Sequence, residues 1–379
     1  MANALTEDQL AIVGAVRDFT AAELAPFANE RDQTKTFPVE TLEHAGRLGL
    51  GGIYVHEDVG GSELGRFTAA LIFEELARGD TAIAAYVSIH NMVAWMIDRY
   101  GDERQREQWL PALTTFVNRG SYCLTEPSAG SDAAAITTTA RREGDDYVVN
   151  GVKQFISGAG AAAVYLVFAR TGERGPRGIS AIIVPAAASG LSFGPDEKKM
   201  GWNAQPTRQV VLEDVRVPVG NRLGAEGDGF GVAMSGLDGG RVNIAACSIG
   251  GAQWALDQTI RYVKERETFG HALADHQSVV YTLADMATEL HAARLLVHDA
   301  ADALDAGHAD ATSRCAMAKR FATDASFTVA NSALQLHGGY GYLAEFGIER
   351  VVRDLRVHQI LEGTNEIMRM IVGRRLLGR

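Results

Sequence analysis

The stretch Tyr147-Val-Val-Asn-Gly-Val-Lys-Gln-Phe155 is the clearest strand signal in the chain. Two runs rich in Val and aromatic residues flank Asn150-Gly151, a dipeptide that favours the tight turn of a β-hairpin. Short apolar runs follow at 164–169, 179–184 and 209–212, each bounded by Gly, Pro or Asp. We therefore expect a β-domain over residues 122–225, with a hairpin that turns at Asn150-Gly151.

On both sides of this region apolar residues recur at helical spacing. In residues 1–121 a helix start is expected at Thr6, and buried helices are expected at 67–77 and 83–96. In residues 226–379 four helical stretches are expected, near 228–266, 275–305, 309–337 and 363–377. The order of helices, strands and helices predicts a mainly α, α+β fold, because a Rossmann-type enzyme would alternate strand and helix and open with a Gly-rich turn.

Composition excludes several classes of function. The chain has 379 residues, 46% of them hydrophobic, and a formal net charge of -11, which argues against binding nucleic acid or an anionic membrane. No apolar run approaches the roughly 18 residues of a membrane span. The first ten residues lack a signal-peptide pattern, so we expect a reducing, cytoplasmic setting. Cys123, Cys247 and Cys315 are expected to be buried free thiols, and no metal site is expected.

Two segments near the β-domain have residue types suited to ligand binding. Residues 122–132 (YCLTEPSAGSD) carry four hydroxyl groups and a Gly-Ser turn that lets a ligand approach the backbone. Phe155-Ile-Ser157 ends the second predicted strand, where an aromatic ring and a hydroxyl can wall a planar ligand. An ordinary loop and a core Phe beside a turn Ser explain the same residues, so both interpretations stay open.

Two further segments lie in the C-terminal part. Gln335-Leu-His-Gly-Gly-Tyr-Gly-Tyr342 has three glycines where a helix end needs one at most, which indicates a close approach by a ligand or another backbone. Glu362-Gly-Thr-Asn-Glu366 precedes the last helix, which Thr364 or Asn365 can cap. Glu362 follows an apolar run, so a partly buried carboxylate with raised proton affinity is expected, and such a group is a candidate general base.

These four segments, in this order, resemble the acyl-CoA dehydrogenases over nearly the whole chain. The resemblance implies an N-terminal helical domain, a central β-domain and a C-terminal four-helix bundle around FAD and an acyl thioester. Three stretches are closest to the members that oxidise isobutyryl-CoA in valine breakdown: 88–98 (SIHNMVAWMID), 201–207 (GWNAQPT) and 357–366 (VHQILEGTNE).

The resemblance also implies roles for individual residues. Phe155 would cover the flavin ring, Ser157 would bind near its N5 edge, and part of the FAD site would come from a neighbouring subunit of a homotetramer. The residues implied to contact FAD are Tyr122, Cys123, Leu124, Thr125, Gly130, Ser131, Phe155, Ile156, Ser157, Thr364, Asn365 and Glu366. Those implied to reach a neighbour's FAD are Arg266, Phe269, His276, Gln277, Gln335, Leu336, His337, Gly338 and Gly339. Those implied to contact substrate are Ser131, Asp238, Gly239, Gly240, Arg241, Leu361, Gly363 and Arg374.

By the same resemblance, Glu362 removes the α-proton of the thioester while the β-hydrogen leaves as hydride to N5 of FAD. The developing enolate oxygen would be stabilised by the Glu362 amide and a ribityl hydroxyl of FAD. Some members carry the base at the position of Gly240, where glycine cannot serve. Leu361 replaces the Tyr that is usual in straight-chain members, which leaves room for a 2-methyl branch. Ser128 replaces a usual Gly, so a left-handed backbone there would cost more.

Alternatives to isobutyryl-CoA are 2-methylbutyryl-CoA and short straight-chain acyl-CoA. An acyl-CoA oxidase is a further alternative within enzymes, although such chains are usually much longer. A relative without catalysis that binds nucleic acid is an alternative of another class, opposed by the net charge and by Glu362. Electron-transfer flavoprotein is the expected electron acceptor, and no nucleic acid or membrane partner is expected.

Overall fold

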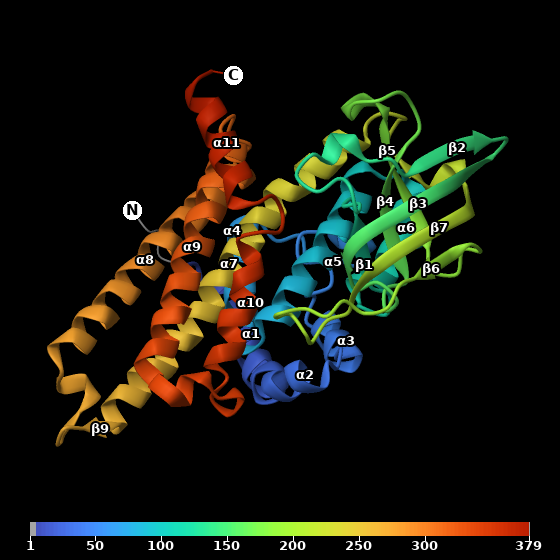
Figure 1. Ribbon diagram of the computed structural model, residues 1–379. Coiled ribbons are helices and arrows are strands. Elements are labelled where there is room, and N and C mark those ends of the chain that lie inside the picture. The colour runs from blue at the N-terminus through green and yellow to red at the C-terminus, as the bar shows by residue number, and fades with distance from the viewer. Residues whose placement is uncertain (1–4, 379) are drawn as a thin grey trace.

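The structure is a computed structural model that describes residues 5–378. Helices form one side of the molecule, the sheet forms the other, and the N-terminal helices lie between them (Figure 1). The predicted α+β fold, mainly helical with a central sheet, is confirmed. No helix in residues 5–378 is both long and apolar enough to cross a membrane.

In residues 5–378, six α-helices precede the sheet. They are α1 (Glu7–Phe19), α2 (Ala28–Thr34), α3 (Val39–Arg47), α4 (Arg66–Gly79), α5 (Thr81–Tyr100) and α6 (Glu103–Thr114). The predicted start of α1 is confirmed by a capping box, in which Thr6 Oγ1 accepts from Gln9 N at 3.2 Å and Gln9 Oε1 accepts from Thr6 N at 3.0 Å. Both predicted buried helices are confirmed as α4 and α5.

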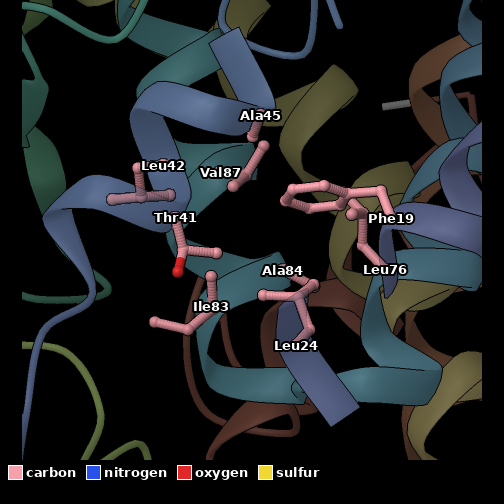
Figure 2. A pocket seen from close by; sticks show the side chains of 9 residues that line it. All are labelled: Phe19, Leu24, Thr41, Leu42, Ala45, Leu76, Ile83, Ala84 and Val87. Carbon is pink, nitrogen blue, oxygen red and sulfur yellow. The ribbon is translucent and has the colours of Figure 1, made fainter. Parts of the chain in front are cut away.

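A small cavity lies among α1, α3, α4 and α5 (Figure 2). Its volume is about 10 Å³, the size of one water molecule. Its lining is apolar apart from Thr41, whose hydroxyl accepts a hydrogen bond from Arg31 Nη2 at 2.8 Å. This cavity is therefore a packing defect without reactive groups, and the candidate site lies elsewhere.

The β-domain is an eight-stranded sheet in the order β6-β7-β3-β2-β4-β5-β8, with β1 beside β4. Its strands are β1 (Gly120–Cys123), β2 (Thr139–Glu143), β3 (Asp146–Ser157), β4 (Val164–Arg170), β5 (Ile179–Pro185), β6 (Leu191–Phe193), β7 (Thr207–Pro218) and β8 (Arg222–Leu223). Two short strands, β9 (Glu267–Thr268) and β10 (His271–Ala272), pair separately. β4 and β5 are buried along nearly their whole length.

The predicted hairpin at Asn150-Gly151 is wrong. β3 runs straight through this dipeptide, and the chain turns earlier, at Gly144, where β2 and β3 join. Gly151 instead shifts the register against β7, and it packs so closely on Thr138 that a Cβ would lie 2.4 Å from the Thr138 hydroxyl oxygen. Asn150 exchanges two hydrogen bonds with Asp214 of β7, each 2.9 Å. The dipeptide therefore serves a β-bulge and a close contact between strands.

Within the described part of the chain, which ends at residue 378, five α-helices follow the sheet. They are α7 (Gly229–Glu265), α8 (Gln277–Asp305), α9 (Ala311–His337), α10 (Ile348–His358) and α11 (Asn365–Leu376). α7 packs against α4, α5, α8 and α9. Its contact with α4 requires glycine, since a Cβ at Gly250 would lie 2.1 Å from the carbonyl oxygen of Glu74. The four predicted helical stretches are confirmed, whereas α10 was missed. The three cysteines are free and buried, as expected.

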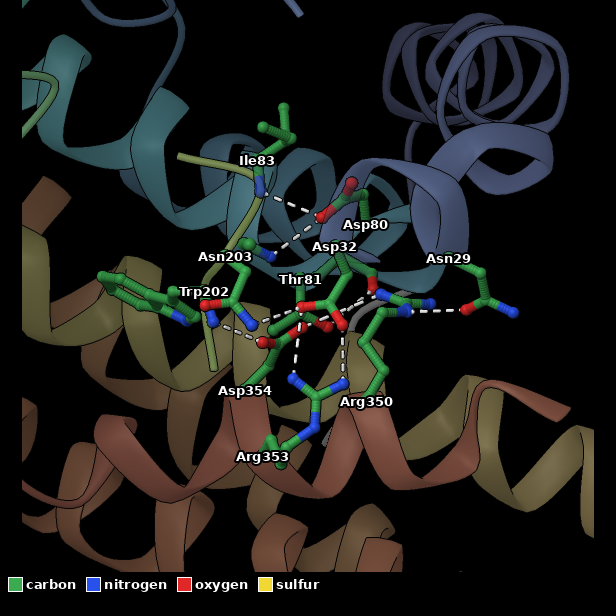
Figure 3. Close-up of polar contacts among 12 residues, drawn as sticks. Asn29, Asp32, Asp80, Thr81, Ile83, Trp202, Asn203, Arg350, Arg353 and Asp354 are labelled. Carbon is green, nitrogen blue, oxygen red and sulfur yellow. Dashed lines mark hydrogen bonds and ion pairs between the residues drawn. The ribbon is translucent and has the colours of Figure 1, made fainter. Parts of the chain in front are cut away.

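α10 was missed because charged residues interrupt its apolar pattern: Ile348, Val351 and Leu355 are buried in the main core, but Arg350 and Asp354 are buried beside them. Arg353 binds Asp32 of α2 at 2.6 Å, and the Asp354 carboxylate accepts from the Trp202 amide at 2.6 Å (Figure 3). Arg350 donates to Asn29 at 2.9 Å. These contacts fasten the helix that leads to residue 362 to both the N-terminal helices and the loop before β7.

Candidate active site

Glu362 lies in the loop between α10 and α11 and has a left-handed backbone. Its φ is 54°, and that of Gly363 is 90°. A left-handed residue with a side chain costs about 1–2 kcal/mol, so the surroundings must hold it. Arg241 Nε donates to the Glu362 carbonyl at 3.4 Å, and Lys319 Nζ donates to the Gly363 carbonyl at 2.9 Å. Two cations thus hold the two carbonyls of this turn.

The turn directs the Glu362 carboxylate inward against α7. Although the residue as a whole is partly exposed, its Oε2 is buried and has no hydrogen-bond partner in residues 5–378. A Cβ at Gly240 would lie 2.3 Å from this oxygen, so the glycine makes the space that the carboxylate occupies. Burial raises the pKa of Glu362 to about 7, against the charges of Lys319 and Arg241. A free carboxylate with a pKa near neutral suits a general base.

The groups around Glu362 come from three parts of the chain. Arg241 binds Asp238 at 2.6 Å, one turn earlier on α7. Burial raises the pKa of Tyr54 and of Tyr122, and both phenols lie near enough for the charge of Glu362 to add to this effect. The Arg66 guanidinium covers the Tyr54 ring at 3.8 Å. Glu362 therefore lies among aromatic rings and cations, and the second carboxylate nearby, Asp238, is bound to Arg241.

The predicted loop 122–132 is anchored to β3 at its base. Gln154 N donates to the Thr125 carbonyl at 2.8 Å, and the buried Lys153 Nζ binds Glu126 Oε1 at 2.8 Å. The Glu126 carboxylate also accepts from three donors on Thr137 and Thr138. Burial opposes ionisation here, but Lys153 and these donors lower the pKa of Glu126 to about 2. Glu126 is therefore a structural carboxylate.

Other residues of this loop and of the end of β3 divide into exposed and buried ones. Gly130 and Ser131 are exposed, and Ser128 does not have a positive φ, so the serine carries no left-handed strain. Phe155 has a φ of 58° and a side chain that is 63% exposed, which leaves its ring free for a ligand. Cys123 and Ile156 point into the β-domain core, so their contacts with a ligand would be made by the backbone.

Residues at the start of α11 differ in what their side chains contact. Thr364 caps the helix by accepting from Ile367 N at 3.3 Å. Asn365 does not cap it, because its side chain is buried and bound by Lys319 Nζ at 2.9 Å. Glu366 and Arg374 are exposed on the same helix. Leu361 is partly buried and packs against the main core.

A second group of predicted residues gathers at the other end of the helices. Its members lie at the end of α7, in the β9–β10 turn, at the start of α8 and at the end of α9: Arg266, Phe269, His276, Gln277 and Gln335–Gly339. In Figure 1, β9 and α11 lie at opposite ends of these helices. On α9 alone, roughly 24 Å of helix axis separates Lys319 from Gln335. One chain therefore does not bring the two groups together.

The second group is open and aromatic. The Phe269 side chain is 94% exposed. Arg266 lies over the Tyr340 ring at 5.5 Å, and Tyr262 stacks on His337 with ring centroids 4.4 Å apart. A Cβ at Gly338 or Gly339 would meet no atom within 4 Å. Exposed rings beside a cation and bare backbone are suited to a planar, charged ligand.

Several site residues were missed by sequence reasoning. Lys319 is one, and its signal was a lone lysine in the alanine-rich helix α9. His358 is another, four residues before Glu362. Trp202 Nε1 donates to His358 Nε2 at 3.1 Å, so the proton sits on Nδ1 and is donated to Ser248 at 2.7 Å. Burial lowers the pKa of His358 to about 3, so it is neutral and fixes the end of α10.

Three family models match the chain in succession. The acyl-CoA dehydrogenase N-terminal domain matches residues 6–116, the middle domain 121–215 and the C-terminal domain 227–377. Among curated relatives, mitochondrial isobutyryl-CoA dehydrogenase of Bos taurus is 52% identical over 373 residues, covering 98% of this chain and 90% of that protein. The protein of the same name from Dictyostelium discoideum is 51% identical with the same coverage.

Solved structures agree with this match. Butyryl-CoA dehydrogenase from Megasphaera elsdenii has a TM-score of 0.96 at 39% identity and covers 100% of both chains. A chain in a structure described as the electron transferring flavoprotein of Acidaminococcus fermentans has a TM-score of 0.97 at 39% identity, also over 100% of both chains. An FAD complex of PigA has a TM-score of 0.95 at 29% identity over 99% of each chain. The family and these neighbours together indicate FAD as the cofactor, and the chain belongs to the acyl-CoA dehydrogenase family of oxidoreductases.

Proposed function

We propose that this enzyme oxidises a short, α-branched acyl-CoA, isobutyryl-CoA, to methacrylyl-CoA in valine catabolism, with Glu362 as the base. The observation that supports this most directly is the unpartnered, buried Oε2 of Glu362, lying against Gly240. The names of the relatives from Bos taurus and Dictyostelium discoideum favour the same substrate.

The chemistry needs one proton acceptor and one hydride acceptor. Glu362 takes the α-proton, and the electron pair of that C–H bond becomes the new α,β double bond. When bound, FAD supplies the hydride acceptor for the β-hydrogen. The Glu362 N–H donates to no acceptor in residues 5–378 and is free to bind the thioester oxygen. Arg241 and Lys319 hold the turn that presents both the amide and the carboxylate.

FAD fits the open surfaces of the chain. The free ring of Phe155 offers a face for a flavin, and a Cβ at Gly130 would meet no atom within 4 Å. We infer that loop 122–131, Phe155 to Ser157 and the start of α11 from Thr364 to Glu366 hold FAD. Ser131, Asp238 to Arg241, Leu361, Gly363 and Arg374 would contact the acyl-CoA.

The second group, at the far end of the helices, would complete the FAD site of another subunit. Phe269 and Gly338-Gly339 are exposed to solvent in a single chain, and a ligand held by another subunit would cover them. The second group lies too far from Glu362 to bind the same FAD. A homotetramer is the assembly expected. Sedimentation of the purified flavoprotein tests this, and a monomer that keeps FAD tightly would contradict it.

Electron-transfer flavoprotein is the proposed electron acceptor. The support is the likeness to a chain in the Acidaminococcus fermentans structure. After anaerobic reduction by an acyl-CoA, the flavin colour should return on adding electron-transfer flavoprotein. Oxygen as an equally fast acceptor would instead indicate an oxidase.

The substrate assignment is tested with a panel of thioesters. Isobutyryl-CoA, 2-methylbutyryl-CoA and butyryl-CoA should each be mixed anaerobically with the enzyme while flavin absorbance is followed. We expect isobutyryl-CoA to bleach the flavin with the largest kcat/KM. A clear preference for 2-methylbutyryl-CoA or butyryl-CoA would move the assignment to the corresponding alternative. A colourless protein that cannot take up FAD would refute the whole proposal.

A further inference from the structure

Lys319 of α9 is a fully buried cation, with no exposed side-chain surface, inside the helical core. Burying an ammonium group is costly unless each of its donors is used and its charge is needed. Nζ donates to the Gly363 carbonyl and to Asn365 Oδ1, both at 2.9 Å. Neither acceptor carries a charge, so these two bonds alone do not explain why a lysine is buried here.

Among the carboxylates that favour the charged form of Lys319, Glu362 has the largest effect, followed by Asp324 and Glu366. Burial lowers the pKa of Lys319 to about 8, so the lysine is charged near neutral pH. Two cations act on the Glu362 carboxylate, Lys319 from α9 and Arg241 from α7, and both lower its pKa against the effect of burial. The other titratable groups that face it are Tyr54, Tyr122 and Cys247, and burial raises the pKa of each, so they are neutral near pH 7. Arg241 is already paired with the Asp238 carboxylate, and this negative charge offsets part of the effect of Arg241 on Glu362.

Lys319 also fixes the position of the carboxylate without touching it. It donates to the carbonyl of Gly363, the residue after Glu362, and so holds the left-handed turn in place. Asn365 is held in turn, because its Nδ2 donates to Thr323 Oγ1 at 3.0 Å and to Asp324 Oδ1 at 2.7 Å. Lys319 therefore acts on Glu362 through the backbone of the next residue, Gly363, and leaves the Glu362 Oε2 without a hydrogen bond in residues 5–378.

We propose that Lys319 is a positioning residue that braces the Glu362–Gly363 turn and keeps the catalytic carboxylate ionised while leaving it unbonded. This inference rests on the proposed role of Glu362 as base. Because an opposite charge a few ångström away typically moves a carboxyl pKa by roughly 1–3, removing the lysine must make Glu362 a group that ionises only at higher pH.

The test compares three variants of the FAD-loaded enzyme across pH 5.5 to 9.5. Lys319→Gln removes the charge and keeps a donor, whereas Lys319→Arg keeps the charge and alters the geometry. Lys199→Gln is the matched control, because Lys199 is partly buried, donates to a carbonyl and a hydroxyl at 2.6 and 2.9 Å, and has a pKa lowered to about 8 by burial. Its two acceptors are the Gln205 carbonyl, in the loop before β7, and the hydroxyl of Thr207, the first residue of β7.

Flavin reduction by the acyl-CoA should respond to these variants in different ways. For Lys319→Gln the acid limb of the rate should move to higher pH, with a loss of at least about tenfold at pH 6.5 that shrinks toward pH 9. Lys319→Arg and Lys199→Gln should keep the wild-type limb even if their plateau rates fall. If Lys319→Gln does not retain flavin, Lys319→Met tests the same loss of charge. An unmoved limb in the neutral variant would overturn the proposal.

A second readout does not need turnover. An acyl-CoA analogue with sulfur in place of the β-carbon can give its α-proton to the base but has no β-hydrogen to transfer. The pH at which the bound analogue deprotonates, followed through flavin absorbance, should rise in Lys319→Gln. If the wild type neither deprotonates this analogue nor is bleached by acyl-CoA, the proposed function fails. If it does both and Lys319→Gln titrates like the wild type, only the role of Lys319 fails.

Discussion

Two glutamates in residues 5–378, the buried Glu126 and the partly exposed Glu362, each have a buried lysine nearby, and the two pairs are built in opposite ways. In the β-domain, Lys153 Nζ binds the Glu126 carboxylate directly at 2.8 Å. In the helical core, Lys319 Nζ binds the carbonyl of the residue after Glu362 and leaves the Glu362 Oε2 without a partner. The pKa of Glu126 is lowered to about 2, whereas that of Glu362 is raised to about 7.

The difference shows how one pair of residue types serves structure and chemistry. A carboxylate whose lone pairs are filled by Lys153, Thr137 and Thr138 holds a loop and has no capacity to take a proton near neutral pH. A carboxylate with a cation nearby is ionised near neutral pH, and an oxygen that accepts no hydrogen bond remains basic enough to take a proton. The absence of one hydrogen bond, maintained by packing against Gly240, distinguishes Glu362, the proposed base, from the structural Glu126.

The largest effect is expected at the base itself. Glu362→Gln keeps the size of the side chain and removes its proton acceptor. Substrate should still bind and perturb the flavin spectrum, while the rate of flavin reduction falls by ~10²–10⁴-fold, the usual worth of general-base catalysis. Stopped-flow measurement of anaerobic reduction checks this. Reduction at close to the wild-type rate would place the base at another residue.

Breaking the Lys153–Glu126 pair should lower the free energy of unfolding rather than the rate of flavin reduction. Lys153→Met leaves Glu126 as an uncompensated buried charge, and breaking such a pair costs about 3–5 kcal/mol in the free energy of unfolding. Lys319→Met, whose two lost acceptors are uncharged, should cost less, about 1–3 kcal/mol. Denaturant unfolding of both variants measures the difference. Equal losses would mean that the two lysines are not used differently.

The pH dependence should separate the two glutamates as well. Glu362 acts when ionised, so flavin reduction should rise through a pH of about 7 and be about tenfold below its plateau at pH 6. For stability the signs are opposite. Glu362 has a folded pKa above the ordinary 4.5, so its contribution falls as pH rises from about 4.5 to 7. Glu126 has a lowered folded pKa, so its contribution is lost as pH falls from about 4.5 to 2.

Glu362→Gln isolates this linkage from other titrating groups. Asp354 is also buried, and its pKa is raised to about 7, so the wild type alone would mix two contributions. The difference in unfolding free energy between wild type and Glu362→Gln should shift in favour of the variant as pH rises from 5 to 8. A difference that does not change with pH would contradict a raised pKa for Glu362.

Sequence reasoning predicted the order of helices and strands and a partly buried carboxylate at Glu362, and the structure confirms both. Both depend on local patterns, whereas the role of Glu362 as base stays a prediction. Sequence reasoning misread Asn150-Gly151, since this dipeptide favours a turn and a β-bulge alike, and only its contacts with Thr138 and Asp214 decide between them. It missed α10, whose buried face mixes the apolar Ile348, Val351 and Leu355 with the charged Arg350 and Asp354. Lys319 lies 43 positions before Glu362 in the chain, and no local pattern links a buried lysine to a carbonyl that distant.

The smallest expected effect concerns the choice between substrates at Leu361, next to the base. Leu361 packs on the core beside Glu362, so Leu361→Tyr adds bulk to a filled space, which costs roughly 1–3 kcal/mol where it meets a ligand. We expect kcat/KM for isobutyryl-CoA to fall by roughly 5- to 150-fold, and that for butyryl-CoA to fall less, because only the branched substrate places a methyl group at the α-carbon. Leu361→Met, which conserves volume, is the matched control and should leave the ratio of the two substrates near that of the wild type. Equal losses for both substrates would show that residue 361 does not sense the branch, and the preference would then have to be sought at Tyr54 and Tyr122, whose phenols lie near the carboxylate.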